Sequence, residues 1–343
     1  MGRAGSNTLL HVARKSKNDE FYTQLSDIES ELKHYGSQFH GKVVYCNCDD
    51  PKVSNFFDYF FQNFKRLGLR KLIASCYKAN TEGRSNVTVS ERGFYVTYSG
   101  EACDKNAFLE QNISYFQGDG DFRSQESIEL LKQSDVVVTN PPFSLFREYV
   151  DQLIEYEKEF LIIGNVNAIT YKEIFKLIKE NAAWLGINLG RGISGFIVPD
   201  HYELYGTETR VDADKNRIVS PNNCLWLTNL DHSQRHTDID LTKTFAGNEE
   251  QYPTYDNCDA INVNKTKDIP LDFNGLMGVP ITFLHKFNPD QFEIIRFRKG
   301  DDGKDLSING KCPYFRILVK NRRCKPSRAE RMQIVNRGTR KYA

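Results

Sequence analysis

A short run of β-branched residues that ends at two consecutive prolines is the feature that most constrains the fold. Residues 136–138 are all valine and Thr139 follows, a pattern typical of a strand buried on both faces of a parallel sheet. The strand must end at Asn140, because Pro141 and Pro142 have no N–H for a ladder and fix φ. Each proline also keeps the preceding residue extended. The sequence therefore predicts a stiff loop at the carboxyl end of a strand, where open α/β sheets bind ligands.

This loop carries groups that suit the activation of a planar amino group. The side-chain oxygen of Asn140 and the carbonyl oxygens held by Pro141 and Pro142 can accept both hydrogens of an exocyclic NH2, which frees the nitrogen lone pair as a nucleophile. Phe143 offers a flat surface for the ring that bears the NH2. The alternative is a strand-ending turn without chemistry, since Asn and Pro are ordinary turn residues.

Apolar periodicity elsewhere predicts alternating strands and helices. We expect strands at residues 42–45, 71–76, 113–116, 160–163 and 224–228, and an edge hairpin at 93–99 within an otherwise irregular stretch. We expect helices that begin after residue 23, near Phe56, at Ser144 as the capping residue, and at Tyr171. The order predicts an α/β fold with a mostly parallel sheet and helices on both faces. The stripe Phe56, Phe57, Phe60, Phe61 and Phe64 is expected in the core.

Composition restricts the class of protein. A chain of 343 residues fits two domains, or one domain with an insertion. No apolar run approaches the roughly 18 residues of a membrane span, and no signal core is present, so we expect a cytoplasmic protein. The eight cysteines form no C-x-x-C pair, so neither a zinc site nor a disulfide framework is expected.

Charge is distributed unevenly along the chain. Residues 320–343 hold nine Lys or Arg and one acidic residue, which leaves 37 basic and 44 acidic residues in the body of a chain whose formal charge is +1. Composition therefore gives only weak support for nucleic-acid binding by the body. A basic tail of this kind can contact phosphates.

The motif from Asn140 to Phe143 resembles the catalytic motif of amino-methyltransferases that use S-adenosylmethionine. Four further segments, at residues 17–23, 43–51, 118–122 and 190–196, resemble the EcoRI-type DNA adenine methyltransferases in the same order. The resemblance runs from near the start to about Lys320. The segment at 43–51 departs from the Gly-rich loop common in other methyltransferases, so side chains must do there what glycines do elsewhere.

The resemblance implies an adenine-N6 methyltransferase that uses S-adenosylmethionine and no metal. It implies a double-stranded GAATTC site, base flipping, a monomeric enzyme with no membrane contact, and protection of DNA from a partner restriction endonuclease. The catalytic residues would be Asn140, Pro141, Pro142 and Phe143. The rivals are a methyltransferase of RNA or of a protein glutamine, and a non-catalytic DNA-binding protein on the same fold.

The segments of the resemblance, together with a polar loop that contains Arg235 and His236, supply candidate binding residues, and a structural alternative stays open for most of them. Cofactor contacts are expected from Phe21, Tyr22, Thr23, Asn47, Asp49, Asp50, Asp119, Asp121 and Phe122. The alternatives are a capped helix start after residue 23 and an Asp-Gly turn followed by a cap at Ser124. DNA contacts are expected from Arg191, Phe196, Arg235 and His236, against a structural bend for the first two and ordinary surface residues for the others.

The expected organisation has four parts. Residues 1–18 form a flexible arm, 19–188 the catalytic methyltransferase domain with a Rossmann-like sheet, 189–320 an α+β target-recognition region, and 321–343 a basic tail.

Overall fold

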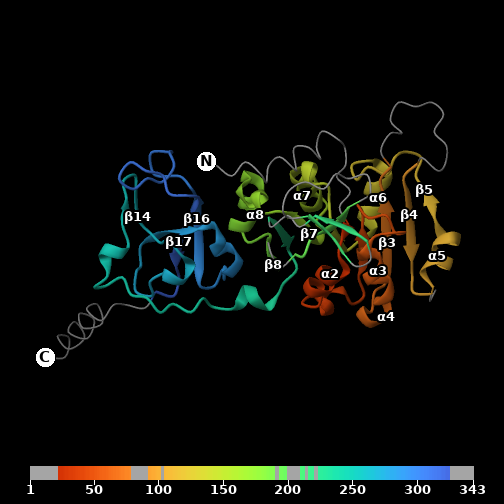
Figure 1. Ribbon diagram of the computed structural model, residues 1–343, viewed down its shortest axis with the longest axis horizontal. Helices are drawn as coiled ribbons and strands as arrows, with labels where there is room; N and C mark the ends of the chain where they lie inside the picture. Colours follow the sequence, from red (N-terminus) through yellow and green to blue (C-terminus); the bar gives the residue numbers. More distant parts are fainter. Residues whose placement is uncertain are drawn as a thin grey trace. The chain divides into compact units, whose positions relative to one another are not determined.

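The computed structural model describes residues 22–78, 92–101, 104–189, 193–198, 209–212, 215–219 and 223–324. The chain divides into two compact units, which are described separately. The first comprises Met1–Ile174 and Ala183–Asp231, and the second Phe175–Ala182 and His232–Ala343 (Figure 1). No helix among the described residues combines the length and the apolar character needed to cross a membrane.

The first unit is built on an eight-stranded sheet with the order β5-β4-β3-β2-β6-β7-β12-β8. Its strands are β2 (Val43–Cys46), β3 (Lys71–Cys76), β4 (Phe94–Tyr98), β5 (Ser114–Tyr115), β6 (Val136–Thr139), β7 (Glu159–Asn165), β8 (Trp184–Leu189) and β12 (Cys224–Thr228). The four central strands β3, β2, β6 and β7 are parallel. At the margins, β4 and β12 run antiparallel to their neighbours. The predicted parallel arrangement thus holds for the centre of the sheet.

Helices cover both faces of the parallel centre. The α-helices are α2 (Leu25–Leu32), α3 (Asn55–Gln62), α4 (Phe64–Leu67), α5 (Lys105–Asn112), α6 (Gln125–Gln133), α7 (Phe146–Glu155) and α8 (Lys172–Lys179). The connection from β2 to β3 passes through α3 and α4, and the connection from β6 to β7 passes through α7. These connections run to opposite sides of the β2–β6 pair, so right-handed crossovers place α3 and α7 on opposite faces.

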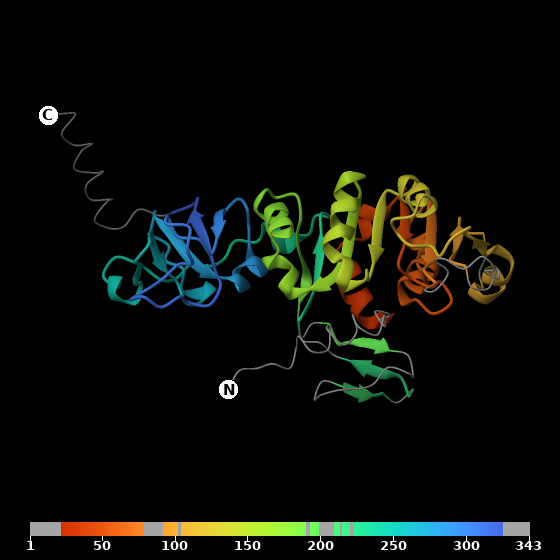
Figure 2. The same cartoon turned by 90° about the horizontal axis from the view of Figure 1, so that it is seen from above.

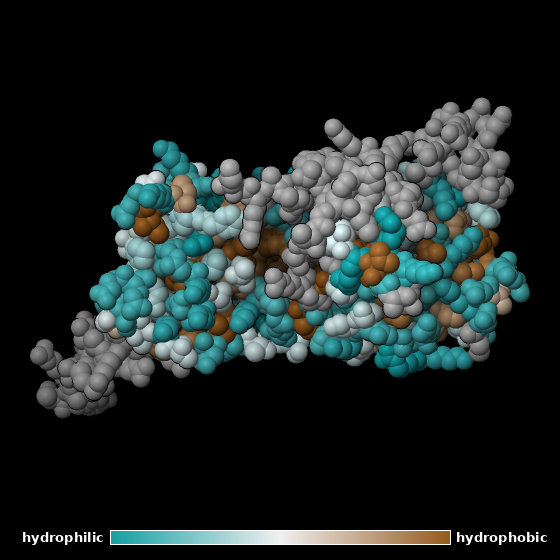
Figure 3. Space-filling view, in the orientation of Figure 1, coloured by the Kyte–Doolittle hydropathy of each residue, from teal (hydrophilic) through white to brown (hydrophobic). Residues whose placement is uncertain are grey.

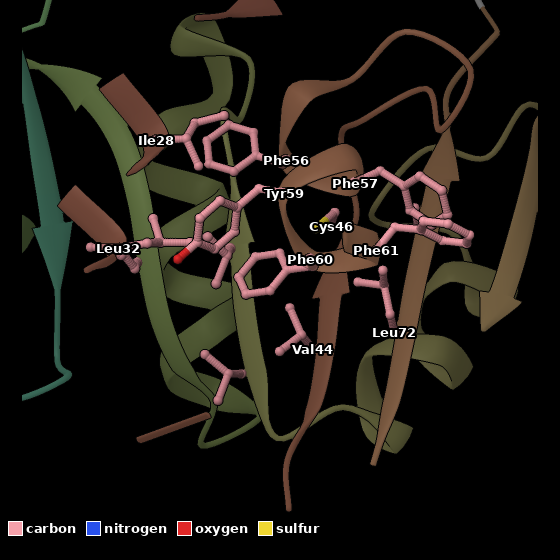
Figure 4. Close-up of a cluster of buried hydrophobic side chains, with 14 of the residues drawn as sticks. Ile28, Leu32, Val44, Cys46, Phe56, Phe57, Tyr59, Phe60, Phe61 and Leu72 are labelled. Carbon is pink, nitrogen blue, oxygen red and sulfur yellow. The ribbon is translucent and has the colours of Figure 1, made fainter. Parts of the chain in front are cut away.

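Aromatic side chains of α3 fill the core on one face of this sheet. Figure 4 shows Phe60 beside Val44 of β2, Phe61 near Leu72 of β3 and Phe56 beside Ile28 of α2. All five phenylalanines of the predicted stripe are at most 7% exposed, so that prediction is confirmed. The helix ends at Gln62, and the last phenylalanine begins α4. Ser54 starts α3 by accepting hydrogen bonds from the first backbone N–H groups of the helix.

A small antiparallel sheet completes the first unit. Its order is β1-β9-β11-β10, with β1 (Tyr22–Thr23), β9 (Phe196–Val198), β10 (Thr209–Val211) and β11 (Arg217–Val219). Figure 2 shows it standing away from the large sheet, beside α2. It joins a segment that precedes α2 to a segment that follows β8.

The second unit contains a five-stranded sheet with the order β13-β14-β15-β17-β16. Its strands are β13 (Thr254–Tyr255), β14 (Cys258–Asn262), β15 (Leu276–Pro280), β16 (Phe292–Phe297) and β17 (Arg316–Asn321). The short 3-10 helices among the described residues are η1 (Gly36–Phe39), η3 (Phe143–Leu145), η4 (Val166–Thr170), η6 (Ser233–His236), η7 (Glu249–Gln251), η8 (Thr266–Asp268) and η9 (Ile281–Lys286).

Three local predictions differ from the structure. Ser144 does not cap the helix after the prolines, because it lies inside the 3-10 turn η3 and α7 begins at Phe146 without a side-chain cap. The stretch at 93–99 is not a hairpin, because β4 pairs with the distant β3. The expected irregular stretch also contains α5, whose capping residue Asp104 accepts a hydrogen bond from the N–H of Ala107.

The strand at Cys224–Thr228 has an unexpected place. As β12 it lies between β7 and β8, antiparallel to both, and all five of its residues are buried. The chain leaves the large sheet after β8, forms the small sheet and returns. The division between the units consequently falls after Asp231. The boundary expected from the sequence lies earlier, after residue 188.

Candidate functional site

The predicted site segments meet where three parallel strands of the large sheet end. From β2 the chain proceeds to β3 on one side, and it later enters β6 on the other side. The loops after β2 and β6 therefore lead to helices on opposite faces, and the region between two such loops is the usual place for a ligand in such a sheet. Residues 47–50 follow β2, Tyr77 and Lys78 follow β3, and Asn140 follows β6.

The loop after β2 turns two of its polar side chains inward. Asn47 and Asp49 are only 4% and 7% exposed. The amide oxygen of Asn47 accepts a hydrogen bond from the Tyr149 hydroxyl on α7. One oxygen of Asp49 accepts from the Ser54 hydroxyl at 2.7 Å, and the other accepts from the Thr139 hydroxyl. Asp49 thus connects the start of α3 to the residue immediately before Asn140.

Burial changes the acid strength of this carboxyl group. Removal from water raises the pKa of Asp49 to about 6, although the hydrogen bonds from Thr139 and Ser54 act to lower it. The nearby charge of Asp50 acts in the raising direction. The Asp49 carboxyl group, which joins the β2 loop to the β6 loop, therefore changes its protonation just below neutral pH.

A contact between the ends of β2 and β3 brings in the segment at 118–122. The carboxylate of Asp50 lies 3.8 Å from the ammonium group of Lys78. The backbone N–H of Lys78 donates to the carbonyl oxygen of Asp119 at 2.8 Å. Gly120, at φ 80°, packs so closely that an added Cβ would lie 2.9 Å from the carbonyl oxygen of Cys76. Asp50 and Asp119 therefore lie at the same edge of the sheet as Asn140.

The contacts of Asp121 and Ser124 are those of the structural alternative, an Asp-Gly turn followed by a helix cap. The guanidinium of Arg123 donates to both carboxylate oxygens of Asp121, at 2.9 and 2.7 Å. Burial acts to raise the pKa of Asp121, but these bonds and the positive charge outweigh it and lower the pKa. Ser124 caps α6 by accepting from the N–H of Ser127. Asp119 contributes to the same turn by accepting from the N–H of Asp121 at 3.0 Å.

Phe122 has little exposed surface and packs against α7. It is 6% exposed, and its ring meets Tyr149 edge to face at 5.1 Å. It also lines a pocket of about 510 Å³ together with Arg123, Ile128 of α6 and Gln152 of α7.

The residues of the Asn-Pro-Pro-Phe motif stand together on a rigid base. Thr139 is fully buried, the side-chain oxygen of Asn140 is buried, and Phe143 is half-buried against the α3-side core. The ring of Phe143 meets Phe196 edge to face, with centroids 6.2 Å apart and planes at 76°. Phe196 is 1% exposed, so in this arrangement it supports Phe143 from the side and presents no open face.

Two carboxylates of α2, which the sequence analysis did not single out, hold the segment that leads to Phe196. Glu31 is fully buried and accepts hydrogen bonds from the backbone N–H groups of Ile187 and Asn188, each at 2.8 Å. An added Cβ at Gly186 would lie 2.4 Å from the Glu31 carboxylate, so only glycine permits this approach. Glu31 therefore fixes the end of β8.

The second carboxylate lies one helical turn earlier. Asp27 accepts from the backbone N–H and the hydroxyl of Ser194, each at 2.9 Å. Gln24 donates to the same hydroxyl at 2.7 Å and to the carbonyl oxygen of Gly195 at 2.9 Å. Burial raises the pKa of Asp27, against the opposing effect of the bonds from Ser194. The signal in the sequence was an acidic pair four residues apart, flanked by the core residues Ile28 and Leu32.

The other predicted residues have these positions. Tyr22 and Thr23 form β1 and pair with Ile197 and Phe196 of β9, and the carbonyl oxygen of Thr23 accepts from Asn55 of α3 at 2.8 Å. Phe21 and Arg191 lie outside the described residues. Arg235 and His236 belong to η6 of the second unit, where Arg235 contacts Asn181 and His236 is exposed.

Comparison with known proteins identifies the family. Residues 9–322 match the family described as adenine-specific methyltransferase EcoRI. The chain belongs to this family. It is 69% identical to the type II methyltransferase M.EcoRI of Escherichia coli over 323 residues, which cover 94% of this chain and 99% of that protein. It is 38% identical to the type II methyltransferases M.MgeORF184P of Mycoplasma genitalium and M.MpnI of Mycoplasma pneumoniae, in each case over 90% of this chain and 97% of the relative. No solved structure matches.

An adenine-specific methyltransferase requires a methyl donor, and the chemistry of the strand-end residues fits one. Asp50 and Asp119 offer acceptors for ammonium, hydroxyl or amino groups, and Tyr77, 45% exposed, offers an aromatic face. Within the described ranges, no cluster of three or more His, Cys, Asp or Glu side chains is arranged to hold a metal ion.

Proposed function

We propose that this enzyme methylates the N6 amino group of adenine in double-stranded GAATTC sites, with S-adenosylmethionine as the donor. In this role it protects DNA from a restriction endonuclease of the same specificity. The supporting observation is the Asn-Pro-Pro-Phe loop at the carboxyl end of β6, beside the β2 loop to which Asp49 binds it. The identity to M.EcoRI supports the choice of substrate.

Asn140 positions and polarises the target amine. Its buried side-chain oxygen and the neighbouring backbone carbonyl oxygens accept the two amino hydrogens, which draws the nitrogen lone pair out of conjugation with the ring. Neutral acceptors stabilise the positive charge that develops on nitrogen, so the proton can leave after attack. When bound, S-adenosylmethionine supplies an electrophilic methyl group. The chain contributes alignment of the amine with that group, and the bond from Thr139 to Asp49 fixes this alignment.

Phe143 holds the adenine ring. An amine inside a duplex is paired and stacked, so the base must leave the helix to reach Asn140. Phe143 then stacks on the base, and Phe196 keeps its ring in place by the edge contact. Arg191 contacts DNA in this proposal, and support comes from its neighbours in the chain, since Glu31 binds Ile187 and Asp27 binds Ser194. Arg235 and His236 contact DNA from the second unit.

The proposed cofactor contacts divide into two groups. Asp50 and Asp119, with the loop backbone and the segment 21–23, contact the donor directly. Asn47, Asp49 and Asp121 act through their bonds to Tyr149, Thr139, Ser54 and Arg123, which set the shape of the loops, and Phe122 closes the wall behind them.

Transfer of a labelled methyl group from S-adenosylmethionine to matched duplexes tests the proposal. We expect N6-methyladenine in a GAATTC duplex and none in a duplex that lacks the site. Asn140→Ala should lower the rate by about 10²- to 10³-fold, because one of the principal acceptors is lost, while DNA affinity stays within a few-fold. Transfer to RNA or to protein glutamine instead, or a fully active Asn140→Ala variant, would contradict the proposal.

A further inference from the structure

An unusually exposed aromatic side chain stands at the start of β17 in the second unit. Tyr314 is 75% exposed, the highest value among the exposed large hydrophobic side chains of the described residues. On the face seen in Figure 3, hydrophobic residues lie in small patches among hydrophilic ones. Single exposed apolar residues are common on protein surfaces, so exposure alone indicates no function. The surroundings of Tyr314 provide the further evidence.

Tyr314 is the outer member of a row of aromatic rings. Its ring lies 4.5 Å from that of Phe315, which lies 6.2 Å from that of Phe297. Phe297 in turn stacks on Phe175, which is 7% exposed, with centroids 5.0 Å apart. The guanidinium of Arg298 covers Phe315 at 4.4 Å. The exposed ring therefore rests on a packed platform that continues into the interior of the unit.

The backbone of Tyr314 is also fixed. Arg316 donates to the carbonyl oxygen of Tyr314 at 2.6 Å and to the side-chain oxygen of Asn262 at 3.0 Å. Asn262 also accepts from the hydroxyl of Tyr255 at 2.9 Å. The backbone of Tyr314 is therefore already ordered, and a ligand that stacks on its ring pays little for ordering it.

The sequence segment that carries Tyr314 is basic. Residues 311–324 include five Lys or Arg and no Asp or Glu. A further hydrogen bond of Arg316, to Asn264 at 3.4 Å, joins it to the neighbouring loop, which carries the exposed Lys265 and Lys267. Two copies of such a surface would repel each other, whereas a polyanion would be attracted.

We propose that Tyr314 contacts a base of the bound DNA by stacking, and that Lys265, Lys267 and Lys311 bind the adjacent phosphates. This inference rests on the proposed function, that is, on DNA as the substrate. Every base has a π face, so an aromatic platform with basic neighbours is the arrangement that binds unstacked or extruded bases. Tyr314 would then contribute to DNA affinity and not to the methyl-transfer step.

Binding measurements on three variants of the full chain test the inference. Tyr314→Ala removes the ring, Tyr314→Phe keeps the ring without the hydroxyl, and Tyr115→Ala is the control, since Tyr115 is 42% exposed on the edge strand β5 of the first unit. With a GAATTC duplex, we expect Tyr314→Ala to raise Kd about 10- to 100-fold. Tyr314→Phe and Tyr115→Ala should stay within about 3-fold. The rate at saturating DNA should be unchanged in all three.

A second readout distinguishes stacking from other contacts. The fluorescence of 2-aminopurine, placed in turn at each position of the site and its flanks, should be lower with wild type than with Tyr314→Ala at one position. Wild-type Kd for Tyr314→Ala, or an equal loss for Tyr314→Phe and Tyr314→Ala, would overturn the stacking role. A change of oligomeric state without a change of Kd would assign the surface to a second copy. If wild type neither binds nor methylates DNA, the proposed function fails as well.

Discussion

At the scale of single residues, the pKa of Asp49 leads to a direct measurement, because its carboxyl group is buried between the two loops of the site. Its pKa in the folded chain is about 6, against its usual 3.8. Between these values the folded chain binds more protons than the unfolded chain, so this group's contribution to stability is complete below about pH 4 and is lost as pH rises through 6.

We therefore predict that wild type loses stability relative to Asp49→Asn as pH rises from 4 to 7. A shift of about 2 pKa units corresponds to a change of about 3 kcal/mol in the difference between the two free energies of unfolding. Urea unfolding of both proteins at a series of pH values measures it. The asparagine variant is its own control, since it lacks the titrating group. A difference that does not vary with pH would show that Asp49 does not titrate in this range.

Phe143 and Phe196 give a second prediction at this scale. Phe143→Ala should lower kcat/KM at least about 10-fold, because the stacking surface for the base is lost. Phe196→Leu keeps an apolar side chain but removes the ring edge 6.2 Å from Phe143, so the loss should be smaller. If Phe196 acts through Phe143, the double variant should be no worse than Phe143→Ala alone. Additive losses would instead give Phe196 a contact of its own.

The sequence was sufficient to predict a strand that ends at the Asn140 loop, because the information for it is local. A valine strand, two prolines and the residues between them determine one another within eight positions. Asp27 and Glu31 escaped notice because their partners lie more than 150 residues away in the chain. From sequence alone, a carboxylate on a helix is expected to face solvent or to form an ion pair. The backbone N–H groups that bind Asp27 and Glu31 become known only from the structure.

At the scale of elements, helix α2 binds the chain on both sides of residues 190–192. Glu31 accepts two backbone N–H groups of the β8 end, a side-chain amide and the Tyr35 hydroxyl. Glu31→Gln replaces one acceptor oxygen with an NH2 group that faces donors. We predict a loss of about 2–4 kcal/mol in the free energy of unfolding, since several charge-assisted bonds weaken together.

Glu29→Gln is the matched control for this prediction. Glu29 is on the same helix, two residues earlier, and is exposed. Its substitution should change the free energy of unfolding by less than about 0.5 kcal/mol. Chemical unfolding of both variants provides the comparison. Equal effects would mean that the buried bonds of Glu31 are not a net source of stability.

The sequence predicted the elements better than it predicted their partners. Strands β3 and β12 begin and end where the apolar pattern does. The position of β12 between β7 and β8 has no local signal, because it depends on pairing with two strands that lie earlier in the chain. The same applies to β4, whose partner β3 is separated from it by a polar stretch.

At the scale of the whole molecule, the two units divide the proposed work between chemistry and recognition. The strands β2, β3 and β6 and the loops that follow them belong to the first unit. The second unit supplies Arg235, His236 and the Tyr314 surface. The boundary at Asp231 means that a recognition region cut out from residue 189 would remove β12 from its place between β7 and β8 in the catalytic sheet.

The basic tail gives the last prediction, and the structure decides where to cut it. Removal of everything after Lys320 would take Asn321 from β17 and Arg323 from its ion pair with Asp238 at 2.5 Å. A chain that ends at Cys324 keeps both and lacks only residues 325–343, with six Lys or Arg and one Glu. If the tail binds phosphates, this truncation should reduce the slope of log K against log salt by between about 1 and about 5.

Salt titration of DNA binding by the truncated chain and by wild type measures this slope. A full-length variant with the six basic residues of the tail replaced by glutamine separates charge from length, and it should show the same reduction. Its thermal midpoint should match that of wild type, because no bond of β17 is altered. An unchanged slope in both variants would assign all phosphate contacts to residues up to Cys324, and the acidic balance of the body would then require those contacts to be gathered on one face, such as the one that carries Lys265, Lys267 and Lys311.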